Sequence, residues 1–336
     1  MKRMVVGLLI VCLLSVNGFA YGPRGHQLVG AIADRRLAKN QAVAKKVRKL
    51  LDGLTLQRVS TLPDEIKSWQ CGREPFGQNR INRELQAFVN ANCNHPSHSE
   101  FHYTDVPVVG NEKYADGEVG RSEFDIVKMI PFCIRVLKGE LPENNERAIT
   151  KSVAVILLTH YMGDMHQPLH VGAEFFDSHG NPFEPTPQNV GFADQGGNKL
   201  TLFTFVNGQR RSAGKFHGYW DGQTVENAFG TQQDAKIAQR LGSKEPADWE
   251  LSGGVETWAE QLANDILPTA REAHERLQYK SIRFATGKPE ISSGRAEEKT
   301  HAAGETFYAL WAADVVKTEI HKGGWRLAAL LEKVVQ

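Results

Sequence analysis

The chain has 336 residues, of which 41% are hydrophobic and 24% are charged, an ordinary composition for a globular protein. It carries 40 Lys and Arg against 39 Asp and Glu, so it lacks the basic excess of proteins that bind duplex DNA. These numbers exclude a disordered, collagenous or coiled-coil chain. If the protein acts on a polyanion, bound cations must supply the attraction locally.

Residues 1–20 have the pattern of a secretory signal peptide. Two basic residues precede an apolar run, and Gly18 and Ala20 place small residues at positions −3 and −1 of a cut after Ala20. A membrane anchor is the alternative, but the run is too short to span a bilayer comfortably. We therefore expect a secreted or periplasmic protein, without a membrane anchor, whose mature chain covers 21–336.

Helical periodicity dominates this mature chain, and we expect one mainly α domain. Residues 201–206 are rich in β-forming side chains and precede Asn207-Gly208, which indicates one arm of a small hairpin. The stretches 173–193 and 286–299 show little periodicity and are expected to be long loops. The predicted helices cover residues 25–37, 123–137, 149–165, 255–277 and 302–321.

Three cysteines remain in the mature chain, and an exported protein can form disulfides. Cys71 and Cys93 flank a polar, loop-like stretch and are the preferred pair. Cys133 lies in an apolar pattern and is expected to be a buried free thiol. No CxxC spacing is present, which argues against a zinc site made of cysteines.

The richest group of candidate ligands begins at His160, near the end of the predicted helix 149–165. His160 and Asp164 are four residues apart and project from one face of a helix. Pro168 cannot continue that helix, so His170 returns from a turn. Imidazole nitrogen and carboxylate oxygen are good zinc ligands. The cluster therefore indicates a metal site rather than a polar helix end capped by histidines.

Other candidate ligands have weaker local signals. His217 and Asp221 repeat the spacing of four, and His102 lies three residues before Asp105. Asp64 follows a proline, so capping of a helix start is the simpler local explanation for it.

The mature N-terminus is itself a candidate ligand. A cut before Tyr21 exposes a free amine and a carbonyl five residues before His26, and the three groups together can hold one ion. Taken alone, His26 is more simply explained as a residue at a helix start.

In this order the motifs resemble the secreted zinc nucleases of the P-one/S-one type, which are related to bacterial zinc phospholipase C. The resemblance covers nearly the whole mature chain, from Tyr21-Gly-Pro-Arg-Gly-His26 to the final segment that begins at Gly323. It implies a single-domain helical fold with three zinc ions in a cleft.

The resemblance also implies which residues hold the ions. One ion is expected at Asp64, His102, His160 and Asp164, a second at His170, His217 and Asp221, and a third at the main chain of Tyr21 with His26 and Asp164. Asp164 would bridge two ions. The family usually begins with Trp, and Tyr21 preserves the main-chain ligands. His166 is outside this set and is either a partner that supports the ligands or a surface residue.

Four further residues match positions that contact the substrate in this family. Lys67 falls where a cation lies beside the phosphate, and Asp105 falls near the attacking water. Tyr103 falls where an aromatic ring stacks on a base, and Asn198 belongs to the motif Asp194-Gln-Gly-Gly-Asn198, which is linked to substrate contact.

The activity that the resemblance implies is hydrolysis of single-stranded DNA and RNA to 5′-phosphate products, and it leaves a 3′-nucleotidase activity open. We expect a monomer without a stable protein partner. Two alternatives remain: a zinc phosphodiesterase that acts on phospholipid, and a secreted zinc-binding protein without catalysis.

Overall fold

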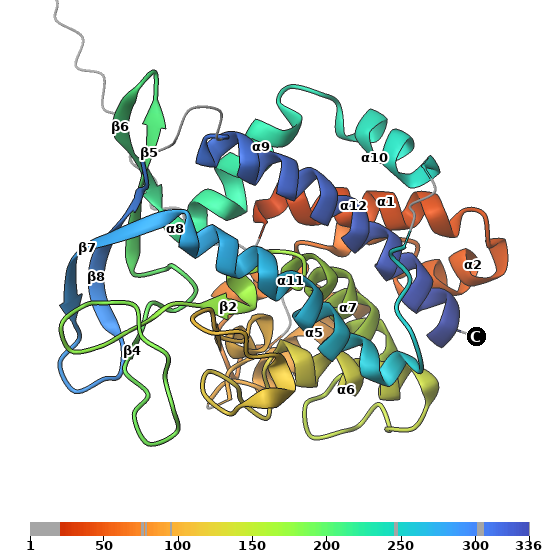
Figure 1. Ribbon diagram of the computed structural model, residues 1–336. Helices are drawn as coiled ribbons and strands as arrows, with labels where there is room; N and C mark the ends of the chain where they lie inside the picture. The colour runs from red at the N-terminus through yellow and green to blue at the C-terminus, as the bar shows by residue number, and fades with distance from the viewer. Residues whose placement is uncertain are drawn as a thin grey trace, which may run out of the picture.

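The computed structural model describes residues 21–74, 77, 79–94, 96–244, 248–300 and 306–335, and Figure 1 shows their arrangement. The helices are α1 (Gly22–Leu37), α2 (Gln41–Leu50), α3 (Leu56–Val59), α4 (Leu62–Glu65), α5 (Arg80–Ala91), α6 (Ile126–Lys138), α7 (Lys151–Asp164), α8 (Phe216–Gly218), α9 (Thr224–Phe229), α10 (Asp234–Ser243), α11 (Trp258–Glu275) and α12 (Tyr308–Val334). The strands are β1 (Val106–Pro107), β2 (Gly172–Ala173), β3 (Phe175–Phe176), β4 (Phe192–Ala193), β5 (Leu200–Val206), β6 (Gln209–Lys215), β7 (Leu277–Phe284) and β8 (Ile291–Glu298). The predicted signal peptide lies outside the described residues. Among those residues, no helix combines the length and apolar character that a membrane span requires.

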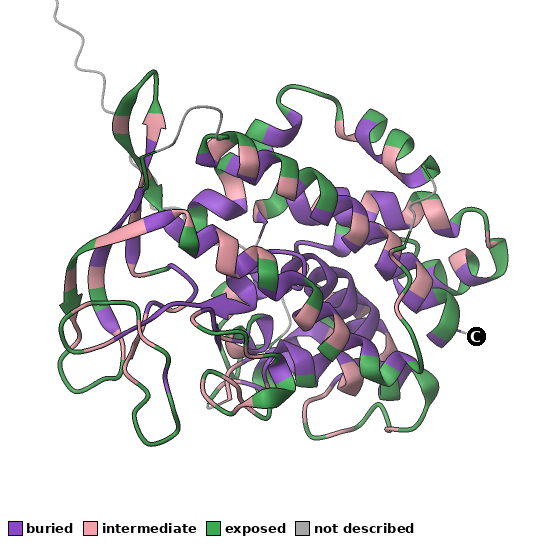
Figure 2. Cartoon of the chain, in the orientation of Figure 1, coloured by how far each residue is buried: buried purple, intermediate pink, exposed green. Residues whose placement is uncertain are grey.

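Helix α7 forms the centre of the helical body. Every residue from Ser152 to Asp164 is buried, as expected for a helix that is apolar on nearly all sides. Helices α1, α6 and α12 pack against it, and Figure 2 shows buried residues concentrated here while the strands and loops are more exposed. The predicted mainly helical fold is confirmed. One consequence is that His160 and Asp164 lie in the interior.

Helix α12 differs from its prediction. The expected helix ended at residue 321, whereas α12 continues to Val334 and residues 301–305 lie outside the described part. The Gly323-Gly324 pair does not end the helix because it lies where α1 crosses closely. A side-chain carbon at Gly324 would lie 2.5 Å from Ile32 Cβ, so the absence of a side chain allows the contact.

A four-stranded sheet with the order β6-β5-β8-β7 lies at one end of the helical body. The predicted hairpin is confirmed, because β5 pairs antiparallel with β6 around Asn207-Gly208. The expected loop 286–299 is wrong, since it contains β8, which pairs with β5 and β7. Buried Glu297 and Glu298 interrupt the apolar alternation of β8. Pairing with the neighbouring strands, rather than a local apolar pattern, therefore makes Ile291–Glu298 a strand. Most of the predicted loop 173–193 is irregular, with short strands at its ends.

The cysteines behave as predicted. Cys71 and Cys93 form a disulfide that ties the segment after α4 to the end of α5. Cys133 is free and buried, and burial raises the pKa of its thiol. The disulfide thus anchors the loop that follows Asp64 and Lys67.

Candidate metal centre and substrate cleft

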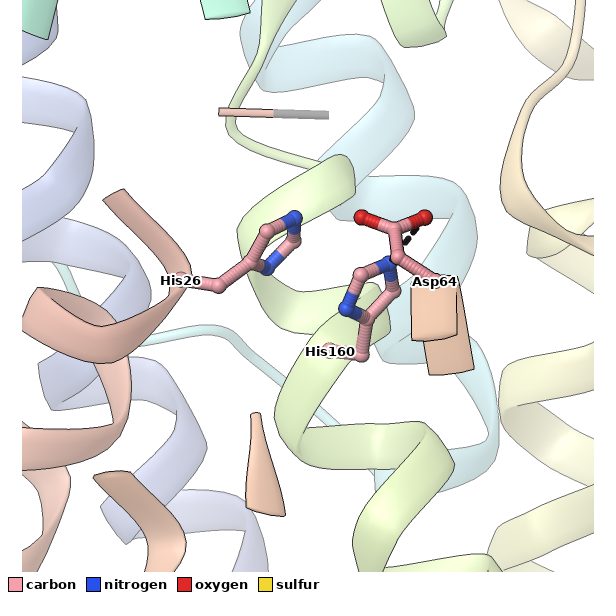
Figure 3. Close-up of side chains that lie close together, drawn as sticks. All are labelled: His26, Asp64 and His160. Atoms are coloured by element: carbon pink, nitrogen blue, oxygen red, sulfur yellow. Dashed lines mark ion pairs between the residues drawn. The ribbon is translucent and has the colours of Figure 1, made fainter. Parts of the chain in front are cut away.

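The end of α7 meets the first turns of α1 and the short helix α4 inside the protein. His26 of α1, Asp64 of α4 and His160 of α7 point toward one another, as Figure 3 shows. Their ligand atoms all lie within 4.8 Å of one another, and His160 Nε2 is 3.6 Å from Asp64 Oδ1. Gly163 allows this approach, because a side-chain carbon there would lie 2.5 Å from His26 Nδ1. Asp64 lies inside α4, so it does not cap a helix that follows it.

Asp164 is the carboxylate that most of the histidines share. Its Oδ2 lies 3.1 Å from His102 Nδ1 and 3.4 Å from His160 Nε2. Its Oδ1 lies 3.4 Å from His26 Nε2. One carboxylate that faces histidines with both oxygens has the geometry needed to serve two cations.

A third group lies where η4 (Pro168–His170) meets α8 and the π-helical turn η5 (Tyr219–Gln223). His170 Nε2 and His217 Nε2 are 3.1 Å apart, and His217 Nε2 is 3.5 Å from Asp221 Oδ2. All three residues are buried and form one of the three clusters suited to a metal ion. The return of His170 from a turn after α7 is as predicted.

Backbone carbonyls fix the orientation of three of these histidines. Nδ1 of His160 donates to the Ser60 carbonyl at 2.7 Å, and Nδ1 of His217 donates to the Gly196 carbonyl at 2.7 Å. His170 Nδ1 donates to the His102 carbonyl at 2.8 Å. Because a carbonyl only accepts, each Nδ1 carries the hydrogen and each Nε2 keeps its lone pair for a metal.

The chemistry of the donor set fits divalent cations. Among the described residues, no hydrogen-bond partner reaches the buried atoms His160 Nε2, Asp164 Oδ1 and Asp221 Oδ2. Burial lowers the pKa of His160 and, with the nearby Asp64, raises the pKa of Asp164. Buried carboxylates are costly unless a cation compensates them. Neutral imidazoles together with such carboxylates are the ligands that zinc accepts.

A cavity of about 230 Å³ opens above these groups. Lys67, Tyr103, Asp105 and Asn198, the four predicted substrate residues, all line it together with His102, His170 and His217. Lys67 Nζ is also 2.7 Å from Asp64 Oδ1, so the ammonium lies beside a candidate ligand. The structure therefore brings the predicted substrate residues and the candidate ligands to one place.

The wall of the cavity combines an exposed ring and a perturbed carboxyl. The Tyr103 side chain is exposed, as an aromatic platform must be, with 40% of its surface accessible. Burial, with a smaller contribution from Asp125, raises the pKa of Asp105 to about 7. A carboxyl with this pKa can exchange a proton near neutrality.

Tyr21 and His166 lie behind the ligands. Tyr21 is fully buried, and its hydroxyl donates to the His166 carbonyl. The His166 ring is also buried, donates from Nδ1 to the Met162 carbonyl and accepts from Arg326 at Nε2. The surface alternative for His166 is therefore wrong, and this residue supports the side chain of Tyr21.

Several residues of the site were not predicted. Ser99, Leu169 and Gln195 line the cavity, and Gln167 Nε2 donates to Asp221 Oδ1 at 2.9 Å. Gln195 lies within the motif noted before Asn198, and Gln167 lies between His166 and Pro168. Their positions within these motifs could have identified Gln195 and Gln167 as residues of the site. The Ser60 and Gly196 carbonyls have no sequence signal, since every residue has a carbonyl.

Comparison with known proteins gives a consistent result. The sequence model of the S1/P1 nuclease family matches residues 21–336. Endonuclease 5 of Arabidopsis thaliana is 23% identical over 347 aligned positions, which cover 99% of this chain and 97% of the relative. Endonuclease 4 of the same plant is 24% identical, with 99% and 95% covered. Endonuclease 1 is also 24% identical, with 98% and 92% covered.

Proposed function

Because this chain belongs to the S1/P1 nuclease family, we propose that it is a zinc-dependent endonuclease that cleaves single-stranded DNA and RNA and leaves 5′-phosphate ends. One observation supports the proposal above all. Two of the three His and Asp clusters contribute His102, His170 and His217 to the wall of the cavity, and the same wall holds Lys67, Tyr103, Asp105 and Asn198. The proposal includes three zinc ions, held by the ligand set predicted above, and export of the protein from the cytoplasm.

Each residue of the cavity has a task in this reaction. When bound, the ions lower the pKa of coordinated water to about 7 and offset the charge of the phosphate. The Lys67 ammonium donates to a non-bridging phosphate oxygen, where negative charge increases in the transition state. Asp105 orients the attacking water by accepting its hydrogen bond. Asn198 positions the substrate through its amide.

Preference for single strands follows from Tyr103. A base can stack on the exposed ring only after it has left its own stack, and such stacking contributes about 1–3 kcal/mol per base whatever the sequence. A paired base must first be unpaired, which costs a few kcal/mol. We therefore expect single strands to be cleaved about a hundredfold faster than the same sequence as a duplex.

The two rival functions differ in what the cavity needs. A phospholipid would require an apolar rim for its acyl chains, whereas Leu169 is the single aliphatic side chain among the described residues that line the cavity. The lining therefore favours a nucleotide. A non-catalytic zinc protein would have no need of a lysine and an Asp with a raised pKa beside the ligands.

The test is an assay of purified mature protein on three substrates: a labelled single strand, its duplex and phosphatidylcholine vesicles. We expect cleavage of the single strand, its loss with a chelator, recovery on addition of zinc, and products that ligase accepts at their 5′ ends. Preferential hydrolysis of phosphatidylcholine would establish the lipid alternative. Full zinc content without hydrolysis of any substrate would establish the non-catalytic one.

A further inference from the structure

The four-stranded sheet has one face that the cleft does not use. Along β5, Leu200, Leu202 and Thr204 are buried, so the alternate residues Thr201, Phe203 and Phe205 belong to the opposite face. Strand register places five charged residues on that face beside them: Arg210 and Lys215 of β6, Lys280 of β7, and Arg295 and Glu297 of β8. We call these eight residues the outer sheet face.

Cations dominate the outer sheet face. It holds four basic side chains and one acidic one, whereas the whole chain has nearly equal numbers of each. Glu297 is only 2% exposed, and it is paired with Arg295 at 2.7 Å, Lys280 at 2.8 Å and Arg210 at 3.5 Å. One cation would neutralise a buried carboxylate. The remaining cations give the face a positive charge beyond what is needed to neutralise Glu297.

Two arginines of this face lie over aromatic rings. The Arg295 guanidinium lies 4.2 Å from the centre of the Phe203 ring, and that of Arg210 lies 4.9 Å from the Phe205 ring. The Arg210 guanidinium is occupied by the Glu298 carbonyl and by Glu297. The Arg295 side chain is 46% exposed and keeps N–H groups beyond its contact with Glu297 that can donate to phosphate. Phe203 thus helps to position Arg295, which with the exposed Lys215 and Lys280 provides the donors of a phosphate-binding surface.

The outer sheet face is continuous with the cleft along the chain. Strand β5 begins two residues after Asn198, and β6 ends two residues before His217. Thr201 and Lys215 are register partners, and Thr201 is three residues from Asn198, at most about 11 Å along the backbone. A strand of substrate that leaves the cleft beside Asn198 therefore reaches the nearest row of cations within a few nucleotides.

We infer that the outer sheet face is a second contact surface for single-stranded nucleic acid, which binds the phosphate backbone of the substrate outside the cleft. The inference rests on the proposed function and adds to it that long strands are held at two places. Because the contacts are to phosphate, binding should be independent of sequence and sensitive to salt. A dinucleotide has a single phosphodiester group, which must lie in the cleft to be cleaved, so its KM should not depend on this face.

The test compares two triple variants with the same loss of charge. Lys215→Gln, Lys280→Gln and Arg295→Gln remove three cations of the face while Arg210 remains to pair with Glu297. The control changes Lys45, Lys46 and Lys49 to Gln on α2, which lies at the other end of the molecule (Figure 1) and exposes all three side chains. Thermal unfolding of both variants checks that they fold.

KM is measured for a single strand of about 30 nucleotides, several times the length that one binding site covers, and for a dinucleotide. For the sheet variant we expect KM for the long strand to rise about tenfold at low salt. The slope of log KM against log salt should fall by about 2, the value for three lost phosphate contacts on a single strand. KM for the dinucleotide and kcat should not change. The α2 variant should match wild type with both substrates.

Equal KM values of the two triple variants for the long strand would overturn the inference and leave the proposed function intact. Failure of the wild type to cleave either substrate would instead overturn the proposed function. Fluorescence anisotropy of the same labelled strand in chelator then tests the face alone. Binding that is weakened in the sheet variant and retained in the α2 variant supports the inference, and equal binding by the two overturns it.

Discussion

Two His–Asp pairs with the same spacing occupy different environments in this protein. His160 and Asp164 lie on the regular helix α7, and His217 and Asp221 span α8 and the π-helical turn η5. Even so, the distances from Nε2 to Oδ2 are nearly equal, 3.4 Å and 3.5 Å. A spacing of four residues thus produces nearly the same distance between histidine and aspartate on the α-helical and the π-helical backbone.

The surroundings of the two carboxylates are not the same. Asp164 lies within 4 Å of ring nitrogens of four histidines: His26, His102, His160 and His170. Asp221 is 3.5 Å from His217 and accepts a hydrogen bond from Gln167. The difference arises because α7 is buried on all sides, so residues from several other elements converge on its end. Spacing places a histidine beside a carboxylate, and packing decides how many further histidines surround that carboxylate.

The largest expected effect on zinc content and kcat comes from replacing the carboxylate of the His160–Asp164 pair, with the same change in the His217–Asp221 pair for comparison. We expect Asp164→Asn to lose more zinc than Asp221→Asn, because Asp164 would hold two ions and Asp221 only one. It should also lower kcat at least about tenfold further, since even an altered supporting residue at a metal site costs about 10–100-fold. Elemental analysis and single-strand cleavage measure both quantities. Equal zinc content in the two folded variants would contradict the idea that Asp164 serves two ions.

Extension of the N-terminus should disturb the surroundings of Asp164 and leave the Asp221 pair intact. A free α-amine has a pKa of about 7.7–8.0, so a metal can displace its proton near neutrality. A Met before Tyr21 converts that amine to an amide, and we expect one ion and most of the activity to be lost. The control Tyr21→Phe keeps the amine and removes only the hydrogen bond to the His166 carbonyl, at about 1 kcal/mol of stability.

Protein cut after Ala20 and protein that begins Met-Tyr21 are compared by mass spectrometry, zinc content and rate. Full zinc and full rate in the extended protein would show that the N-terminus is not a ligand.

The metal affinity of the His217–Asp221 pair should depend on the loop that contains Gly196, because the Gly196 carbonyl orients His217. The His160–Asp164 pair should be less sensitive to a substitution at Ser60, whose carbonyl orients His160. Gly196 has a φ of +55°, and a side-chain carbon there would lie 2.2 Å from the Leu169 carbonyl oxygen. Gly196→Ala should therefore displace the carbonyl that orients His217 and weaken metal affinity about 10–100-fold. Ser60→Ala is the matched change beside His160, and it keeps the carbonyl. Zinc titration should show weaker zinc affinity for Gly196→Ala alone. Similar affinities in the two variants would contradict a role of the Gly196 carbonyl in orienting His217.

A change that touches neither pair should have the smallest effect. Tyr103 lines the cavity above the ligands, so Tyr103→Ala should leave zinc content unchanged. It should raise KM for single strands about tenfold, near the lower part of the range for loss of a stacking ring. Unchanged kinetics would mean that Tyr103 has no part in substrate binding.

Much of this arrangement was predictable because it depends on local chemistry. Helical periodicity identified α1, α6, α7 and α11 to within a few residues, and the Asn-Gly turn identified the β5–β6 hairpin. The cysteine pair was also correct. The errors occurred where partners distant in sequence decide the outcome: β8 forms although Glu297 and Glu298 are buried in it, and α12 continues through two glycines that α1 covers.

The sequence by itself determined the residue types and spacings, and these depend on neighbours within one helical turn or one hairpin. His160 with Asp164 and His217 with Asp221 are pairs of this kind. Only the tertiary structure decided that Asp64, which looks like a helix cap, and His26, which looks like a helix start, meet at His160. It also decided that Asp105 has a raised pKa and that four cations gather on one face of the sheet. Burial and long-range contact depend on which elements pack together, which no short stretch of sequence contains.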